Sequence, residues 1–135
     1  MRGQRRIRRQ ADVPAEVAAV VDKPLYVLHG AIKTPPMSTL ARVTVGFLLR
    51  RVQQGEHLTM PDSRTMPELG ASCHELRVDD EELNTSWRVV YMIDDVAILV
   101  LEVFKKESRS TPESVKRACL DRLSRYLAAK RGTTP

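Results

Sequence analysis

The sequence has few cysteines, few aromatic residues and no long apolar run. Its two cysteines, Cys73 and Cys119, lie far apart and match no metal-ligand spacing. We therefore expect two buried thiols in a reducing compartment. No apolar run approaches the roughly 18 residues that span a bilayer, and the arginine-rich start lacks the apolar segment of a secretory signal. These absences predict a cytoplasmic protein that does not contact a membrane.

Sequence motifs for cofactors and metals are also missing. The glycines are scattered, and no Gly-rich turn is followed by the Lys-Ser or Lys-Thr of a phosphate-binding loop. None of the three histidines lies at helical spacing from another histidine or near a Cys-X-X-Cys pair. The sequence therefore predicts neither a cofactor nor a metal ion.

The length of 135 residues suits one domain, and 42% hydrophobic content suffices for one modest core. Because there are only two Phe, three Tyr and one Trp, Val, Leu and Ile must fill most of that core. Residues 1–22 are predicted to be a basic N-terminal extension, and residues 23–131 the folded domain.

Positive charge is concentrated at the C-terminal end of the chain. The net charge is +5, and residues 105–135 hold nine Lys or Arg against three acidic residues. Such a segment favours a polyanionic partner, because neutralising phosphates releases counterions. A solvated helix face would show the same pattern, so charge alone leaves both interpretations open.

Apolar periodicity predicts an α+β domain with a small, antiparallel-rich sheet. The order is a strand, a helix, a three-stranded meander and a C-terminal helix, with both helices on one side of the sheet. The strands are expected at 25–29, 73–78, 87–93 and 96–104, and residues 56–72 as a loop. The last strand is almost wholly apolar, as is typical of a strand buried on both faces.

The two helices show capping signals and apolar stripes. Ser38 is expected to cap the first helix and Gly55 to end it, whereas Thr111 is expected to cap the second, with Pro112 in its first turn. The predicted inward positions of the first helix are Leu40, Val43, Phe47, Leu48 and Val52. Those of the second are Val115, Cys119, Leu123 and Tyr126.

Charged residues on the meander strands are the candidates for chemistry. Glu75 and Arg77 share one face of their strand, Arg88 begins the next strand, and Glu102 interrupts an apolar strand near its end. Metal-free RNA cleavage by the 2′-hydroxyl needs such a cluster: cations stabilise the pentavalent phosphate, and a carboxylate or His moves protons. The same residues could instead form a surface ion-pair ladder across strands, and His74 could be a packed histidine.

The order of these motifs resembles the RelE/HigB toxin superfamily, and most closely its phage-derived HigB-like branch. The resemblance covers about residues 23–127. It rests on His74-Glu75-Leu76-Arg77, Trp87-Arg88-Val89, the stretch from Val100 to Lys106, and Thr111-Pro112.

The resemblance implies a RelE-like fold and a toxin that cleaves mRNA in the ribosomal A site. It implies catalytic roles for Arg77, Arg88 and Lys105, with Lys106 as the alternative to Lys105, and Glu102 is the candidate for proton transfer by its position. It implies RNA-binding roles for Lys106, Arg109, Lys116 and Arg117. The implied partners are the mRNA, the ribosome and a cognate helix-turn-helix antitoxin. Many relatives have His where this chain has Glu102, which leaves the proton-transfer residue open.

Two other functions fit the same residues. One is a basic RNA- or ribosome-binding or host-inhibitory protein of phage origin that lacks chemistry. The other is an α/β interaction module whose charges are solvated. The enzyme requires Arg77, Arg88 and Lys105 or Lys106 to converge, whereas the interaction module does not.

Overall fold

The computed structural model describes residues 22–28 and 36–132. The predicted N-terminal extension, except for Asp22, and the end of the first predicted strand lie outside these ranges. The elements are β1 (Leu25–Val27), α2 (Thr39–Gln53), β2 (Ser63–Thr65), β3 (Cys73–Asp80), β4 (Thr85–Ile93), β5 (Ile98–Lys105) and α3 (Glu113–Gly132). This order confirms the predicted α+β class. The prediction that residues 56–72 are a loop was wrong in one respect, because this segment contains the short strand β2 between Pro61 and Pro67.

The five strands form one mixed sheet in the order β1-β5-β4-β3-β2. β1 pairs with β5 in parallel, and the other neighbouring pairs are antiparallel. The predicted three-stranded meander is therefore confirmed as β3, β4 and β5. A bulge lies in the β4–β5 pairing at Val90 and Tyr91.

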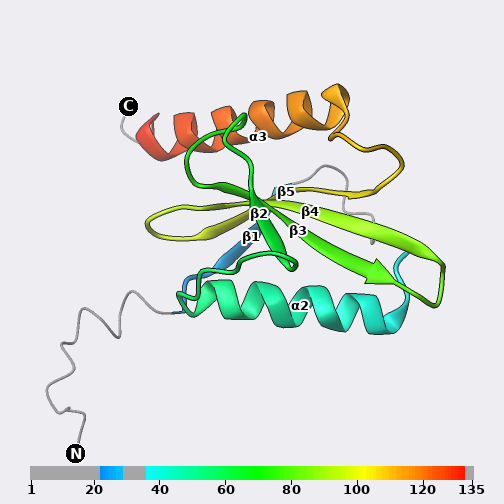
Figure 1. The fold of residues 1–135 in the computed structure, drawn as a ribbon. Coiled ribbons are helices and arrows are strands. Elements are labelled where there is room, and N and C mark those ends of the chain that lie inside the picture. The colour runs from blue at the N-terminus through cyan, green and yellow to red at the C-terminus, as the bar shows by residue number, and fades with distance from the viewer. Residues whose placement is uncertain (1–21, 29–35, 133–135) are drawn as a thin grey trace, which may run out of the picture.

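The helices lie on opposite faces of the sheet, not on one side as the sequence predicted (Figure 1). α2 packs on a cluster that includes Leu76, Val89 and Val100. α3 packs through Cys119 and Leu123 on a cluster that includes Leu99. β5 alternates between the two clusters, and a strand that is apolar on both faces needs a cover on each. The apolar character of this strand was the signal for two covering layers.

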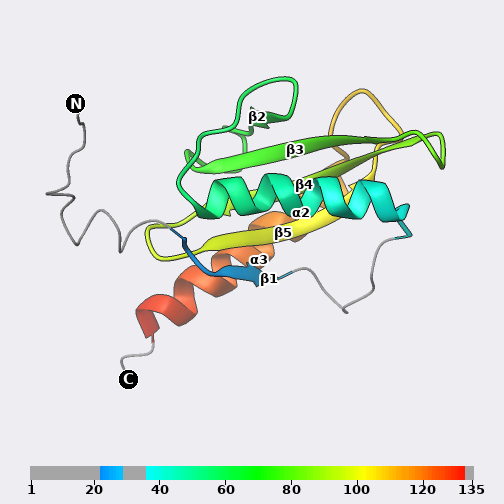
Figure 2. The same ribbon diagram turned by 90° about the horizontal axis from the view of Figure 1, so that it is seen from below.

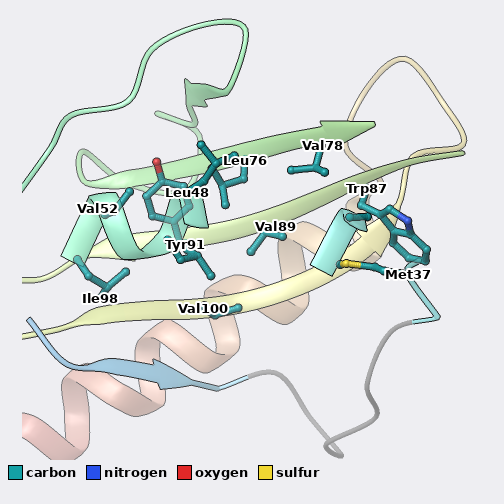
Figure 3. Close-up of a cluster of buried hydrophobic side chains, with 12 residues drawn as sticks. Met37, Leu48, Val52, Leu76, Val78, Trp87, Val89, Tyr91, Ile98 and Val100 are labelled. Carbon is teal, nitrogen blue, oxygen red and sulfur yellow. The ribbon is translucent and has the colours of Figure 1, made fainter. Parts of the chain in front are cut away.

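The buried face of α2 also differs from the prediction. Ala41, Leu48, Leu49 and Val52 are buried, whereas Leu40, Val43 and Phe47 are 71%, 61% and 61% exposed. Figures 2 and 3 show α2 across the sheet and its contacts with Tyr91 and Ile98. The predicted ends of α2 are confirmed: the Ser38 side chain accepts from the Ala41 amide, and Gly55 follows with φ 95°.

α3 buries the predicted stripe through Cys119 and Leu123, and Val115 and Tyr126 are partly buried beside them. Both cysteines are free and buried, as expected. Burial raises the pKa of the Cys119 thiol to about 12, so it stays protonated and unreactive. Within the described part of the chain, no helix has the length and apolar character to cross a membrane.

Candidate active site

A small cationic pocket lies on the α3 side of the sheet, next to the start of α3. We call it the arginine pocket, and its volume is about 100 Å³. It is lined by Arg64, Glu75, Arg77, Arg88, Phe104, Lys106, Ser108, Arg109, Ser110 and Thr111. These residues come from β2, β3, β4, β5 and the loop between β5 and α3. Segments distant in sequence therefore converge on one hollow.

Strand pairing sets the centre of the pocket. Arg77 and Arg88 are direct cross-strand partners, so their side chains leave the sheet on the same face. Glu75 precedes Arg77 by two residues and shares this face. Two like charges opposite each other would normally destabilise a strand pair. A nearby carboxylate offsets this repulsion.

That carboxylate is Glu75, whose side chain is only 3% exposed. Its Oε1 lies 2.8 Å from Arg64 Nε, 3.7 Å from Arg77 Nη1 and 3.9 Å from Arg88 Nε. Its Oε2 accepts a hydrogen bond from the Thr111 hydroxyl at 3.2 Å. A buried carboxylate is stable only with such partners. Glu75 thus holds three guanidinium groups around one point.

Arg64 and Thr111 are pocket residues that the sequence analysis missed. Arg64 donates to Glu75 and, at 3.3 Å, to the Thr111 hydroxyl. Thr111 was expected to cap α3, but its side chain bonds Glu75 instead, and α3 begins at Glu113. A three-residue strand has no readable period, so nothing in the sequence near Arg64 indicated its position.

The pocket carries excess positive charge. Among the described residues that line it, five are cationic and one, Glu75, is a carboxylate. Burial and the neighbouring charge of Arg77 lower the pKa of Arg88, although Glu75 opposes this effect. A guanidinium stays protonated in proteins even so. The arrangement therefore suits an anionic ligand, which would relieve the mutual repulsion of these cations.

Four of the predicted site residues meet in this pocket: Arg77, Arg88, Lys106 and Arg109. Lys105 is exposed and pairs in register with Trp87, whose side chain packs in the α2 cluster. Lys105 therefore lies on the other face of the sheet. Lys106, the alternative for the same role, is the lysine that lines the pocket.

The other predicted site residues lie outside the pocket. Glu102 forms an ion pair with Arg122 of α3 at 3.3 Å. Lys116 pairs with Glu113 at 3.4 Å, and Arg117 is exposed on α3.

His74 stacks on Tyr91, with ring centroids 5.2 Å apart, within the α2 layer. Burial and the charge of His57 lower the pKa of His74. No group of residues suited to hold a metal ion occurs within 22–28 and 36–132.

Together, the fold and the pocket define a small RelE-like α+β protein with a cationic site. The profile of the phage-derived Gp49-like protein family (DUF891) matches residues 35–124. This is more than half of the chain, and the protein belongs to that family. The family is one of the RelE/HigB-like toxin families and is associated with toxins of toxin–antitoxin systems. Among curated proteins, no sequence matches this one.

Proposed function

We propose that this protein is a ribosome-dependent mRNA endoribonuclease, the toxin of a toxin–antitoxin pair of the HigB-like branch. The observation that carries the proposal is the convergence of Arg64, Arg77 and Arg88 on one buried carboxylate, with Lys106 and Arg109 at the same pocket. Membership of a toxin-associated family supports it. We further propose that residues 23–131 form the toxin domain and that residues 1–22 are an extension to it.

The pocket groups match the needs of RNA cleavage by the 2′-hydroxyl. The hydroxyl loses its proton to a base and attacks the adjacent phosphorus, the bond to the 5′-oxygen breaks, and that oxygen takes up a proton from water. The products are a 2′,3′-cyclic phosphate and a 5′-hydroxyl. Arg77 and Arg88 stabilise the extra negative charge of the pentavalent phosphate, with Lys106 and Arg109 beside them. Cationic groups preorganised in this way commonly supply the largest part of catalysis.

Glu75 takes the place that the sequence analysis gave to Glu102. It is the only carboxylate among the residues that line the pocket, whereas Glu102 is paired with Arg122. In this proposal Glu75 accepts the proton of the attacking hydroxyl and also keeps the arginines in position. General-base catalysis of this kind contributes roughly 10²–10⁴-fold to the rate.

The proposed partners follow from the family. A toxin of this kind requires an antitoxin, which we expect to be a helix-turn-helix DNA-binding protein encoded beside it. The proposed site of action is the ribosomal A site in the cytoplasm.

The test is induced expression of the wild type, Arg88→Ala and Arg125→Ala, with mapping of mRNA 5′ ends. Arg125 is an exposed arginine on α3 and serves as the matched control. We expect growth arrest and new 5′ ends within codons for the wild type and for Arg125→Ala. Cleavage by Arg88→Ala should fall by about 10²–10³-fold, because a transition-state contact is lost.

The outcomes separate the enzyme from a protein that only binds. Growth arrest without new 5′ ends, unchanged by Arg88→Ala, would favour a non-catalytic ribosome-binding protein. Cleavage that survives Arg88→Ala at full rate would show that the arginine pocket is not the active site.

A further inference from the structure

An open groove of about 530 Å³ continues from the arginine pocket toward the β3–β4 turn. The two hollows share Lys106, Ser108 and Arg109. The far wall of the groove is formed by Asn84, Thr85 and Ser86, and the acidic residue Glu107 lines the near side next to Lys106. The Lys106 amide donates to the Ser86 carbonyl at 2.8 Å, so the two walls are tied at their base. A ligand bound in the pocket can therefore reach the groove past the residues that line both hollows.

The far wall differs from the pocket in charge. Asn84, Thr85 and Ser86 offer an amide and two hydroxyls, which donate and accept hydrogen bonds without net charge. On the other side of this wall lie the carboxylates of Asp79 and Glu81, around a further hollow that the same three residues line. Ser86 donates to Asp79 at 2.7 Å, so its oxygen can still accept a hydrogen bond. These carboxylates, together with Glu107 in the groove itself, would repel a second phosphate, whereas they would tolerate a neutral heterocycle.

Asn84 could be present for its backbone conformation or for its amide side chain. Its φ of 50° lies in the left-handed region, where Asn and Gly are the residues that fit with little strain. A backbone role alone would be served equally by Gly. Replacing Asn84 with Gly therefore removes the amide side chain and keeps the turn.

We propose that the groove holds the nucleobase adjacent to the phosphate bound in the arginine pocket, and that Asn84 contacts the edge of that base. The ligand is then single-stranded RNA that bridges both hollows. Phosphate contacts position such a strand, and side-chain amides and hydroxyls read the edges of its bases. This inference rests on the proposed function for its choice of RNA as the ligand.

The test measures binding without cleavage. A trinucleotide with 2′-O-methyl groups has no free 2′-hydroxyl and cannot be cut, and inorganic phosphate serves as the minimal ligand. Backbone amide NMR shifts are followed during titration of each ligand into the full chain. Phosphate should shift amides of the arginine pocket, such as those of Arg88 and Thr111. The trinucleotide should shift these and also the amides of residues 84–86.

Variants assign the contact to the side chain. Asn84→Gly should weaken trinucleotide binding about five- to tenfold, as expected for one lost hydrogen bond, with a much smaller effect on phosphate. Arg88→Ala should weaken both ligands, and Arg125→Ala neither. A thermal melt of each variant checks that it is folded.

The inference falls if the trinucleotide leaves residues 84–86 unshifted, or if Asn84→Gly binds it as the wild type does. Either result can occur while mRNA cleavage is still observed. The proposed endoribonuclease activity would then be retained, and the proposed nucleobase site in the groove would be rejected. Conversely, if the protein cuts no mRNA but the trinucleotide shifts the amides of residues 84–86, the nucleobase site in the groove is supported and the endoribonuclease activity is rejected.

Discussion

Glu75 is the residue on which the geometry of the candidate site depends. It neutralises part of the charge of three arginines, because one of its oxygens accepts a hydrogen bond from Arg64 and lies within 4 Å of the guanidinium groups of Arg77 and Arg88. The same carboxylate also bonds Thr111, which joins the pocket to the start of α3. A change at this position should therefore affect stability as well as activity.

Glu75→Gln should lower the free energy of unfolding by about 1–3 kcal/mol, because the guanidinium groups lose their buried counter-charge. Added phosphate should recover part of this loss, since an anion that binds only the folded state stabilises it. Urea denaturation with phosphate or chloride at equal ionic strength measures both effects. Glu113→Gln is the control, because Glu113 is an exposed carboxylate paired with Lys116. Equal stability of Glu75→Gln and the wild type in chloride would contradict the role given to Glu75.

The sequence predicted part of this site. Alternation along the strands was enough to place Glu75 and Arg77 on one face and to suggest that Arg88 meets them. Which of Glu75 and Glu102 belongs to the pocket depended on which carboxylate forms an ion pair with α3. Arg122 of α3 pairs with Glu102, and Glu75 lines the pocket. Such a contact between a strand and a helix that begins about ten residues later has no sequence pattern of its own.

At the level of elements, the order was predicted correctly and the layering was not, although the apolar character of β5 indicated a cover on each face. Strand and helix periods differ clearly, which is why the alternation of elements was confirmed. The face of α2 was ambiguous, because two stripes of the helix satisfy the three- and four-residue spacing. One stripe holds Leu48 and Val52, and the other holds Leu40, Val43 and Phe47. Only packing against the sheet decides between them.

The two stripes of α2 should differ in their effect on stability. Leu48→Ala should cost about 2–5 kcal/mol of unfolding free energy, because Leu48 is 4% exposed in the core. Leu40→Ala should change it by no more than about 0.5 kcal/mol, because Leu40 is largely in solvent. The two substitutions are chemically identical and lie in one helix, so helix propensity cancels between them. Urea denaturation followed by circular dichroism provides the measurement, and equal costs would reject the assignment of the buried face.

For the whole molecule, the charge distribution separates two regions around β3 and β4. Basic residues from three strands and one loop gather at the arginine pocket, whereas Asp79, Glu81 and Glu82 cluster at the β3–β4 turn. The net charge of +5 thus understates the local field at the pocket. A focused field of this kind raises the rate at which a polyanion associates, and the effect weakens with salt.

A second polar cluster is centred on Asp94, in the turn between β4 and β5. It connects the sheet to α3 and to the residues before β1. The Asp94 carboxylate accepts hydrogen bonds from the Tyr126 hydroxyl and from Lys130 Nζ, each at 2.8 Å. Its backbone carbonyl accepts from Lys23 Nζ at 2.7 Å. The β4–β5 turn is thereby joined to the C-terminal half of α3 and to the residues before β1.

This cluster should give stability a defined dependence on pH. Burial alone would raise the pKa of Asp94, but the hydrogen bonds from Lys130 and Tyr126 outweigh burial and lower it. Burial and Asp94 raise the pKa of Tyr126 to about 12, so its hydroxyl donates throughout the neutral range. A carboxyl whose pKa is lower in the folded state stabilises the fold above its unfolded pKa of about 3.9 and loses this contribution as pH falls below that value.

Asp94→Asn should therefore be less stable than the wild type by about 1–2 kcal/mol near pH 7, where the charged hydrogen bonds are intact. The difference should shrink toward zero as the pH is lowered below about 4, since protonation of Asp94 removes the same charge from the wild type. Urea denaturation of both proteins at several pH values measures it. Asp95→Asn is the matched control, because Asp95 contacts the same lysine but is 76% exposed, and exposed ion pairs contribute little. A stability gap for Asp94→Asn that is as large at about pH 3 as at pH 7 would mean that the charge of Asp94 contributes nothing to holding α3 on the sheet.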